Sequence, residues 1–512
     1  MSENSAIAQG WGRLAALPRP TLTELFETDA DRARALSHRL EFDCGEHDPV
    51  GLLIDWSKTH LDKAALDILE EIAREAGFEQ AREDLFSGAI VNPTEGRPAT
   101  HAAMRGSGTE AQVEEAEALL ARMDMLVSAI QEGALGVVKH CIHIGIGGSA
   151  LGPALVLDAL TRDLAYVDCH VVSNIDGLAL EEAFASCDPA TTLIAVASKT
   201  FTTTETMINA ASALTWLEKA GIADPGGRVI ALTANPERAV EWGVDETRVL
   251  PFPESVGGRY SLWSSIGFPV ALAVGMDEFR AFLAGAKAMD DHFRETSGRA
   301  NAPLLAAFAD RYYAHVRGCE TRAVFAYDER LALLPDYLQQ LEMESNGKRV
   351  SAKGKPLDQP SAPITWGGVG TDAQHAVFQL LHQGTHLVPV DFIASIAPGD
   401  DLDPAHHRQL LMNCLAQGAA LMAGESASDE ARAYPGDRPS TTFLLDDCDA
   451  ATLGALIAFH EHRTFANAVL MGINPFDQFG VELGKRLAKQ IDHGGGTFDP
   501  STLALMRAAG LG

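Results

Sequence analysis

The chain has 512 residues and is 46% apolar, which is enough for two or three globular domains with cores of their own. Its 70 acidic residues outnumber its 40 Lys and Arg residues and give a formal net charge of −30. This charge argues against nucleic acid or an anionic membrane as the main partner. An anionic substrate must be attracted by a local group of basic side chains.

Seven scattered Cys residues without a C-x-x-C arrangement predict reduced thiols in a cytoplasmic protein. The N-terminus lacks the basic-then-apolar plan of a signal peptide. No uninterrupted apolar run reaches the roughly 18 residues that a transmembrane helix needs, so we expect no membrane association.

Residues 1–125 carry mainly helical periodicity, as in DKAALDILEEIAREAGF at 62–78, and we expect a helical N-terminal region that packs on the larger domain. From residue 141 short apolar runs alternate with helical stretches, which predicts α/β domains with mainly parallel sheets. We expect a first such domain at 126–285 and a second at 286–512. Their predicted strands are 141–146, 165–173, 191–198 and 228–235 in the first, and 321–328, 386–394 and 440–447 in the second.

The segment CIHIGIGGSALGP at 141–153 predicts a strand, a Gly-rich turn and a helix N-terminus, a combination that binds anionic groups. Gly145, Gly147 and Ala150 satisfy only a loose form of the dinucleotide fingerprint. Gly148-Ser149 adds a hydroxyl to the turn, and the GK[ST] of a triphosphate loop is absent. An NAD-dependent dehydrogenase therefore remains an alternative that this loop alone supports.

A second polar segment, SKTFTTTET at 198–206, follows the apolar run LIAVA and precedes a helical stretch. Hydroxyl groups and one ammonium at a helix N-terminus can bind a phosphate monoester without a metal. The alternative is a Thr-rich capping loop without a ligand. Two such loops at the carboxyl ends of strands in one sheet favour the phosphate site.

Two charged side chains are candidates for proton chemistry. Arg259 lies between a glycine pair and an aromatic residue in GGRYSLWSSIG, which suits a cation directed into a cleft, although a surface arginine after a turn fits equally. Glu344 lies in QLEMESNGK, where Asn346-Gly347 is expected to end the helix. Taken alone, Glu344 and Lys348 form an ordinary i,i+4 solvent pair.

The histidines do not predict a metal site. His375 and His382 are seven residues apart, which predicts that they share a helix face, but no i,i+4 pair with a third ligand accompanies them. The segment HEHR at 460–463 begins like the H-E-x-x-H motif of zinc proteases but lacks its second His, so it does not match the motif. The segment NPFDQFGVELGKRLAKQ at 474–490 predicts a closing helix, with Asn474 as its N-cap and Pro475 in its first turn.

Together these segments resemble the glucose-6-phosphate isomerase (phosphoglucose isomerase) family, and they follow the family's order from residue 52 to residue 485. They differ from its usual pattern at TDAQH for TNGQH, at FDQF for FDQW and at Pro98 and Thr100. The matching segments are LLIDWSK, NPTEGRPATHAAMR, GIGGSALGP, SKTFTTTET, GGRYSLWSSIG, QLEMESNGK, ITWGGVGTDAQH, LLHQGTH and FDQFGVELGK.

The resemblance implies two sugar-isomerase (SIS-type) three-layer α/β/α domains, a homodimer, and reversible isomerisation of glucose 6-phosphate and fructose 6-phosphate in glycolysis and gluconeogenesis, without cofactor or metal. Glu344 would move a proton between C2 and C1 through a cis-enediol(ate), and Arg259 would stabilise the developing negative charge. His375, supplied by the neighbouring subunit, and Lys485 would assist ring opening. The substrate-binding residues implied are Gly148, Ser149, Ser198, Lys199, Thr200, Phe201, Thr202, Thr203, Gln340 and Gln478.

Two further alternatives remain beside the dehydrogenase. One is an isomerase for a different sugar, such as mannose 6-phosphate, because one enediol serves both epimers at C2. The other is a non-catalytic sugar-phosphate sensor. A sensor would have no need of Glu344, Arg259 and Lys485 together, and all three are present.

Overall fold

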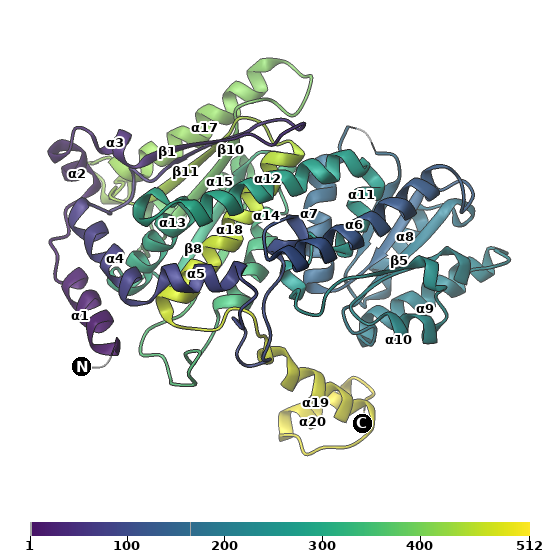
Figure 1. The fold of residues 1–512 in the computed structure, drawn as a ribbon. Helices are drawn as coiled ribbons and strands as arrows, with labels where there is room; N and C mark the ends of the chain where they lie inside the picture. The colour runs from purple at the N-terminus through teal and green to yellow at the C-terminus, as the bar shows by residue number, and fades with distance from the viewer. Residues whose placement is uncertain (1–2, 164, 512) are drawn as a thin grey trace. The chain divides into compact units, whose positions relative to one another are not determined.

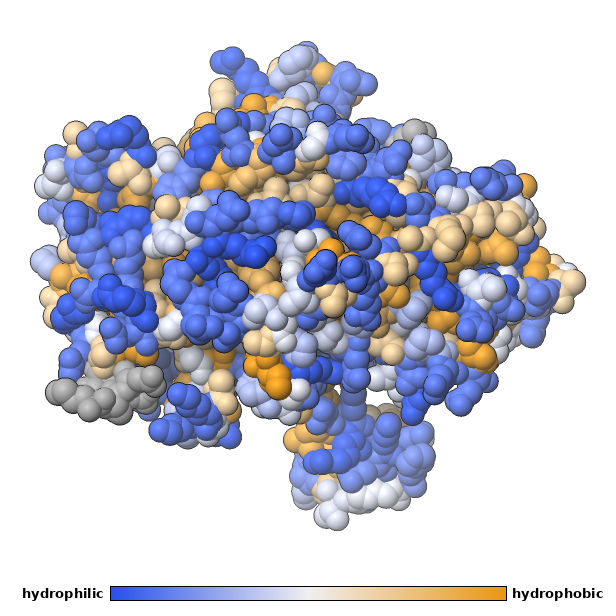
Figure 2. Space-filling view, viewed as in Figure 1, coloured by the Kyte–Doolittle hydropathy of each residue, from blue (hydrophilic) through white to orange (hydrophobic). Residues whose placement is uncertain are grey.

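The computed structural model describes residues 3–163 and 165–511, and these divide into a first unit that ends at Pro475 and a second that begins at Phe476 (Figure 1). No helix among the described residues is long and apolar enough to cross a bilayer. The face shown in Figure 2 is mostly hydrophilic, with apolar residues in small groups.

A five-stranded parallel sheet in the first unit has the order β4-β3-β5-β6-β7. It confirms the four strands expected for the first domain and adds β7, a strand of only three residues that the sequence analysis did not predict. The strands are β3 (His140–Ile144), β4 (Asp168–Val172), β5 (Thr192–Ala197), β6 (Val229–Thr233) and β7 (Val249–Pro251).

Helices cover both faces of this sheet and make three layers. Apolar side chains of the first helix layer pack on Ile142, Ile194 and Val229. That layer consists of α8 (Gly177–Ser186), α9 (Thr204–Lys219) and α10 (Pro236–Trp242). The second layer contacts β4 and β7 from the other side and consists of α6 (Glu110–Gln131), α7 (Leu151–Leu160) and α11 (Phe268–Val274).

The second sheet has six strands in the order β1-β2-β11-β10-β8-β9. Its four later strands are parallel, and β2 joins β11 in an antiparallel pairing. The three strands predicted for the second domain, β8, β10 and β11, are confirmed. The strands are β1 (Ser37–Phe42), β2 (Val50–Asp55), β8 (Thr321–Tyr327), β9 (Ile364–Val369), β10 (Val390–Ser395) and β11 (Ser440–Leu445).

The N-terminal region is less purely helical than predicted, because residues 37–55 contribute β1 and β2 to the second sheet. The strand β1 has the sequence SHRLEF, in which only Leu40 is buried, so it shows little of the alternation that identifies a strand. The helices of this region are α1 (Glu3–Ala15), α2 (Leu22–Thr28), α3 (Arg32–Ala35), α4 (Lys63–Glu75) and α5 (Phe78–Phe86). The helix predicted at 62–78 is thus confirmed as α4.

The second sheet is also packed between helices. Cys414 and Leu421 of α17 and Phe378 of α16 pack on one face. On the other face α18 is buried along nearly its whole length against α12 and α13 and also contacts β2. The helices are α12 (Met276–Glu295), α13 (Ala302–Arg311), α16 (Phe378–Gln383), α17 (Pro404–Ala423) and α18 (Ala450–Met471).

The predicted closing helix begins later than expected. In the second unit α19 spans Glu482–Asp492, after a single turn at Phe479–Val481, and α20 spans Pro500–Ala508. Asn474 is therefore no helix cap. Its Nδ2 instead donates to Asn92 Oδ1 and Thr94 Oγ1, both at 2.9 Å, and so holds the chain before Pro475 against the N-terminal region.

Candidate active site

The Gly-rich turn forms at the carboxyl end of β3, in the short helical turn Gly147–Ser149. Gly147 has φ +58°, a conformation that favours glycine. His143 of β3 donates from Nε2 to the carbonyl oxygen of Ser149 at 2.7 Å and holds the turn against the strand. Burial lowers the pKa of His143 to about 4, so this imidazole is neutral at physiological pH.

Gly148 brings the turn directly against the main chain that carries Arg259. A Cβ at this position would lie 2.2 Å from the carbonyl carbon of Gly258 and 2.4 Å from the nitrogen of Arg259. Only glycine permits this approach. A Cβ on Gly147 would lie 2.9 Å from Nε2 of Gln340, so Gln340 also adjoins the turn, as its predicted role requires.

Arg259 is buried and held by three different groups. Its Nε donates to Ser345 Oγ at 2.6 Å, and its Nη2 donates to the carbonyl oxygen of Pro475. Its Nη1 lies 3.5 Å from Oε2 of Glu344. Tyr260 stands beneath the guanidinium, and its hydroxyl is 2.8 Å from Ser345 Oγ. The cation is therefore fixed before any ligand arrives.

Glu344 lies at the end of a π-helical turn, Gln340–Glu344, which continues α14 (Leu334–Gln339). Such π-helical turns are rare in proteins overall, and those that occur are often found at functional sites. The side chain of Glu344 is 23% exposed, whereas that of Arg259 is 1% exposed. The carboxylate is thus accessible to a ligand, while its cationic partner is shielded from water. The helix ends at Asn346, as predicted from Asn346-Gly347.

Buried contacts on both sides of Glu344 hold this turn in place. Two residues earlier, Glu342 pairs with Arg322 of β8 and accepts from Thr365 Oγ1 of β9 at 2.8 Å. Two residues later, Asn346 Nδ2 donates to the carbonyl oxygen of Thr464 in α18 at 2.9 Å. These contacts connect the turn to β8 and β9 and to α18, the helix that packs on the second sheet.

The hydroxyl-rich loop follows β5, which pairs with β3, so both loops lie at the same edge of the parallel sheet. Within it, Ser198 Oγ and Thr203 Oγ1 are 3.0 Å apart, and Thr200 Oγ1 and Thr202 Oγ1 are 2.8 Å apart. Phe201 takes φ +52° and is buried. Its burial anchors a tight turn whose hydroxyls bond to one another.

Thr203 stands at the N-cap of the 16-residue helix α9, but its side chain makes no capping hydrogen bond because it is directed to Ser198. The amides of the first turn of α9 are therefore not capped by Thr203 and are suited to an anion. Glu205 is the acidic residue in that turn.

Lys199 does not direct its ammonium toward the hydroxyl groups. Its Nζ donates to the carbonyl oxygens of Glu254 at 2.6 Å and Val256 at 3.0 Å, in the segment just before Arg259. Burial, with a smaller contribution from Arg97, lowers the pKa of Lys199 to about 8. The side chain joins the hydroxyl-rich loop to the segment that carries Arg259.

The prediction that His375 and His382 share one helix face is wrong, because one helix ends at Ala376 and the next begins at Phe378. His375 belongs to α15 (Gly370–Ala376) and His382 to α16. His375 is exposed in the single chain. Gln478 and Lys485 lie in the second unit, with Lys485 exposed on α19, and their predicted parts in the site stay predictions.

Three side chains that shape this site were not predicted from the sequence: His143, Ser345 and Glu342. Each is a polar residue in a buried setting, since all three are at most 6% exposed. A histidine within an apolar strand, as in CIHIGI, was the one available signal. The partners of Ser345 and Glu342 are distant in sequence, so no local pattern could have revealed them.

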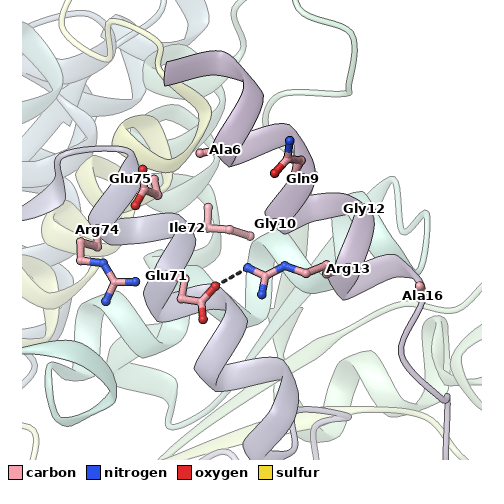
Figure 3. A pocket seen from close by; sticks show the side chains of 10 residues that line it. All are labelled: Ala6, Gln9, Gly10, Gly12, Arg13, Ala16, Glu71, Ile72, Arg74 and Glu75. Atoms are coloured by element: carbon pink, nitrogen blue, oxygen red, sulfur yellow. Dashed lines mark hydrogen bonds and ion pairs between the residues drawn. The ribbon is translucent and has the colours of Figure 1, made fainter. Parts of the chain in front are cut away.

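A cavity of about 560 Å³ lies elsewhere, between α1 and α4 (Figure 3). An Arg13–Glu71 ion pair crosses it, and none of its lining residues is among the predicted site residues. Gly10 contributes to its wall because it packs closely on Ile72. We assign no ligand to this cavity.

Comparison with known proteins identifies the family. The model of the phosphoglucose isomerase family matches residues 55–506. The chain belongs to the phosphoglucose isomerase family. It is 71% identical to a glucose-6-phosphate isomerase of Erythrobacter litoralis, over 99% of this chain and all of that relative. It is 57% identical to one of Zymomonas mobilis, over 99% of each chain.

Solved structures agree with this family assignment. A crystal structure of a glucose-6-phosphate isomerase from Chlamydia trachomatis superposes with a TM-score of 0.88 at 29% identity, over 99% of this chain and 98% of that one. A structure of a hypothetical protein from Thermus thermophilus gives a TM-score of 0.65 at 25% identity, over 84% of this chain and 98% of that one. The predicted α/β fold with mainly parallel sheets is confirmed.

Proposed function

We propose that this protein is a glucose-6-phosphate isomerase that interconverts glucose 6-phosphate and fructose 6-phosphate by acid/base catalysis. Relatives that carry this name match the chain over nearly its whole length at up to 71% identity. The observation that carries the proposal is the pairing of an accessible carboxylate, Glu344, with a buried arginine 3.5 Å away, beside the Gly-rich turn.

Isomerisation requires removal of a proton from carbon next to a carbonyl. In the proposed mechanism Glu344 takes this proton from C2 and returns it to C1 through a cis-enediol(ate). A positioned carboxylate contributes roughly 10²–10⁴-fold to such a step. Arg259 stabilises the negative charge that develops on the enediol oxygen. Its contacts with Ser345 and Pro475 hold it in place in advance, which is the condition for strong electrostatic stabilisation.

The hydroxyl-rich loop binds the phosphate in this proposal. Ser198, Thr200, Thr202 and Thr203 exchange their mutual hydrogen bonds for bonds to phosphate oxygens, and the amides of α9 add theirs. Lys199 contributes its positive charge, while its contacts with the carbonyls of 254 and 256 keep the loop aligned with Arg259. Ser149, Gly148 and Gln340 line the sugar-binding part of the site.

Several parts of the proposal concern assembly and location. His375 acts from the neighbouring subunit of a homodimer, which agrees with its exposure in the single chain. Gln478 and Lys485 complete the site, with Lys485 assisting ring opening. The proposed division into two sugar-isomerase domains, at 126–285 and 286–512, has its boundaries within α6 and α12. The enzyme acts in the cytoplasm without a catalytic metal, and its seven free thiols suit that compartment.

The decisive experiment measures isomerisation of fructose 6-phosphate with a chelator present, coupled to a dehydrogenase specific for glucose 6-phosphate. Glu344→Gln should still bind fructose 6-phosphate but should lose exchange with solvent of the proton at C2 of glucose 6-phosphate, which is the proton at C1 of fructose 6-phosphate. Glu115→Gln, on the exposed side of α6, serves as the matched control and should behave as wild type.

Each alternative predicts a different result in that assay. A sugar-phosphate sensor would bind the ligand and show no turnover in the wild type. A mannose 6-phosphate isomerase would form no glucose 6-phosphate. A dehydrogenase would change nicotinamide absorbance without the coupling enzyme. Normal proton exchange in Glu344→Gln would overturn the assignment of the base.

A further inference from the structure

Three groups that can bind a metal meet at the opposite end of the first sheet from the Gly-rich turn. His140 begins β3, His170 lies in β4, and Cys187 is the C-cap of α8. One ligand atom of each residue lies within 4.8 Å of the other two. No residue of the proposed catalytic mechanism belongs to this cluster.

The fold itself explains why these residues meet. In the parallel β3–β4 pair His140 is opposite Asp168, and Ile142 is opposite His170. Alternate residues of a strand share a face, so His140, Asp168 and His170 project from the same side of the sheet. The helix α8 packs on this side, since Ile142 and Cys187 belong to one apolar cluster. Its last turn therefore brings the Cys187 thiol to the two imidazoles.

The hydrogen-bonding state of the histidines also indicates a ligand. Nδ1 of His140 and Nε2 of His170 are both shielded from solvent and have no hydrogen-bond partner among the described residues. Nε2 of His170 lies 3.3 Å from Oδ2 of Asp168, but not in hydrogen-bond geometry. Buried polar atoms without partners are rare, and an ion is one of the usual reasons for them.

We propose that His140, His170 and Cys187 bind one divalent transition-metal ion of the zinc type, with Asp168 as the fourth ligand. Two imidazole nitrogens, a thiolate and a carboxylate oxygen suit Zn²⁺ and exclude Mg²⁺ and Ca²⁺, which take oxygen ligands. Around a tetrahedral zinc, ligand atoms lie about 3.3–3.6 Å apart. Small side-chain rotations that draw the 4.8 Å cluster together by about 1 Å would reach that geometry.

The bound ion would have a structural role. The strand β4 is at the edge of the sheet and would be tied to β3 and to the end of α8. His140 and Ile144 are four positions apart along β3, which corresponds to about 13 Å, so the metal would be well away from the Gly-rich turn. Removal of the metal should therefore lower thermal stability without stopping turnover, which separates this proposal from the catalytic one.

Co²⁺ titration of untagged, full-length, chelator-treated protein tests the proposal, because thiolate-bound Co²⁺ absorbs strongly in the near ultraviolet. We expect one Co²⁺ per chain with this band, its displacement by Zn²⁺, and a higher Tm in the presence of Zn²⁺. Cys187→Ser should abolish the band, and His170→Ala should weaken binding by more than about 100-fold. The matched controls are Cys414→Ser, a buried thiol in α17, and His406→Ala, an exposed histidine in the same helix.

Circular dichroism should show that each variant is folded, and His140→Gln provides a second test if Cys187→Ser fails to fold. Absence of a thiolate band in the wild type would overturn the proposal. A band that persists in Cys187→Ser but disappears in Cys414→Ser would also overturn it. Stoichiometric Co²⁺ binding without the band would place the metal at another site and refute this one.

Discussion

Substitution of Gly148 by alanine tests directly whether the turn and Arg259 act as one unit. The new methyl carbon would lie 2.2 Å from the carbonyl carbon of Gly258, where ordinary contacts begin at 3.4 Å. The two main-chain segments must therefore separate by roughly 1 Å, and a displacement of that size at a catalytic group costs about 10²-fold in rate. We expect kcat for fructose 6-phosphate to fall about 100-fold, which corresponds to about 2.7 kcal/mol in the barrier.

The matched control is Gly177→Ala at the start of α8, where an added methyl carbon has no atom within 4 Å. It should keep wild-type kcat and Tm. Gly148 does not occupy the left-handed region, so backbone strain does not confound the comparison. The coupled isomerase assay measures kcat, and calorimetry measures Tm. Wild-type kcat in a folded Gly148→Ala protein would refute the inference that this contact positions Arg259.

Three further substitutions test single contacts. Ser345→Ala removes the acceptor for Arg259 Nε and should lower kcat about 10–100-fold with little change in the binding of a substrate analogue, as steady-state kinetics and calorimetry would show. Thr203→Val should raise KM about 10–100-fold, and an unchanged affinity for an inhibitory sugar-acid phosphate would contradict the phosphate site. In the folded chain the pKa of His143 is lowered from 6.5 to about 4. As pH falls, the unfolded chain therefore takes up a proton on this residue at a higher pH than the folded chain does. The free energy of unfolding thus decreases as pH falls from about 6.5 to about 4. His143→Gln should reduce the slope of unfolding free energy against pH by about 1.4 kcal/mol per unit, measured by urea denaturation.

Much of the architecture follows from local patterns. Seven strands were predicted from short apolar runs, because a buried parallel strand has a continuous apolar sequence. Four strands of the described residues were not predicted. The strand β1 is largely polar, β9 has the sequence ITWGGV, in which two glycines supply no side-chain pattern, and β7 has only three residues. The strand β2 is apolar but lies in a region whose periodicity is mainly helical. Close packing explains one of the two glycines of β9, since a Cβ on Gly367 would meet the carbonyl oxygen of Val324 at 1.8 Å.

The residues of the candidate site also fall into those that were predicted from the sequence and those that were not. The 198–203 loop was predicted from its run of hydroxyl groups, whereas the roles of Glu344 and Arg259 came from the family resemblance, because their neighbouring residues fit a solvent ion pair and a surface arginine equally well. Ser345 and His143 were not predicted, because their roles depend on contacts formed only in the folded chain. The proposed metal ligands show this limit most clearly: His140, His170 and Cys187 are separated by irregular distances, and only strand pairing unites them.

The unequal burial of the two central side chains fits the chemistry proposed for them. In an aldose–ketose isomerisation the base must reach two adjacent carbons in turn, whereas the negative charge develops on two neighbouring oxygens of the cis-enediolate, which one fixed cation can stabilise. The side chain of Glu344 is partly exposed and its ion pair with Arg259 is 3.5 Å long, so its carboxylate can rotate between the two carbons. Arg259 is fixed by a serine and by a main-chain carbonyl, so it does not need to reorganise as charge develops. A lysine at position 259 could not make the same set of directed contacts, because it lacks the rigid fork of the guanidinium.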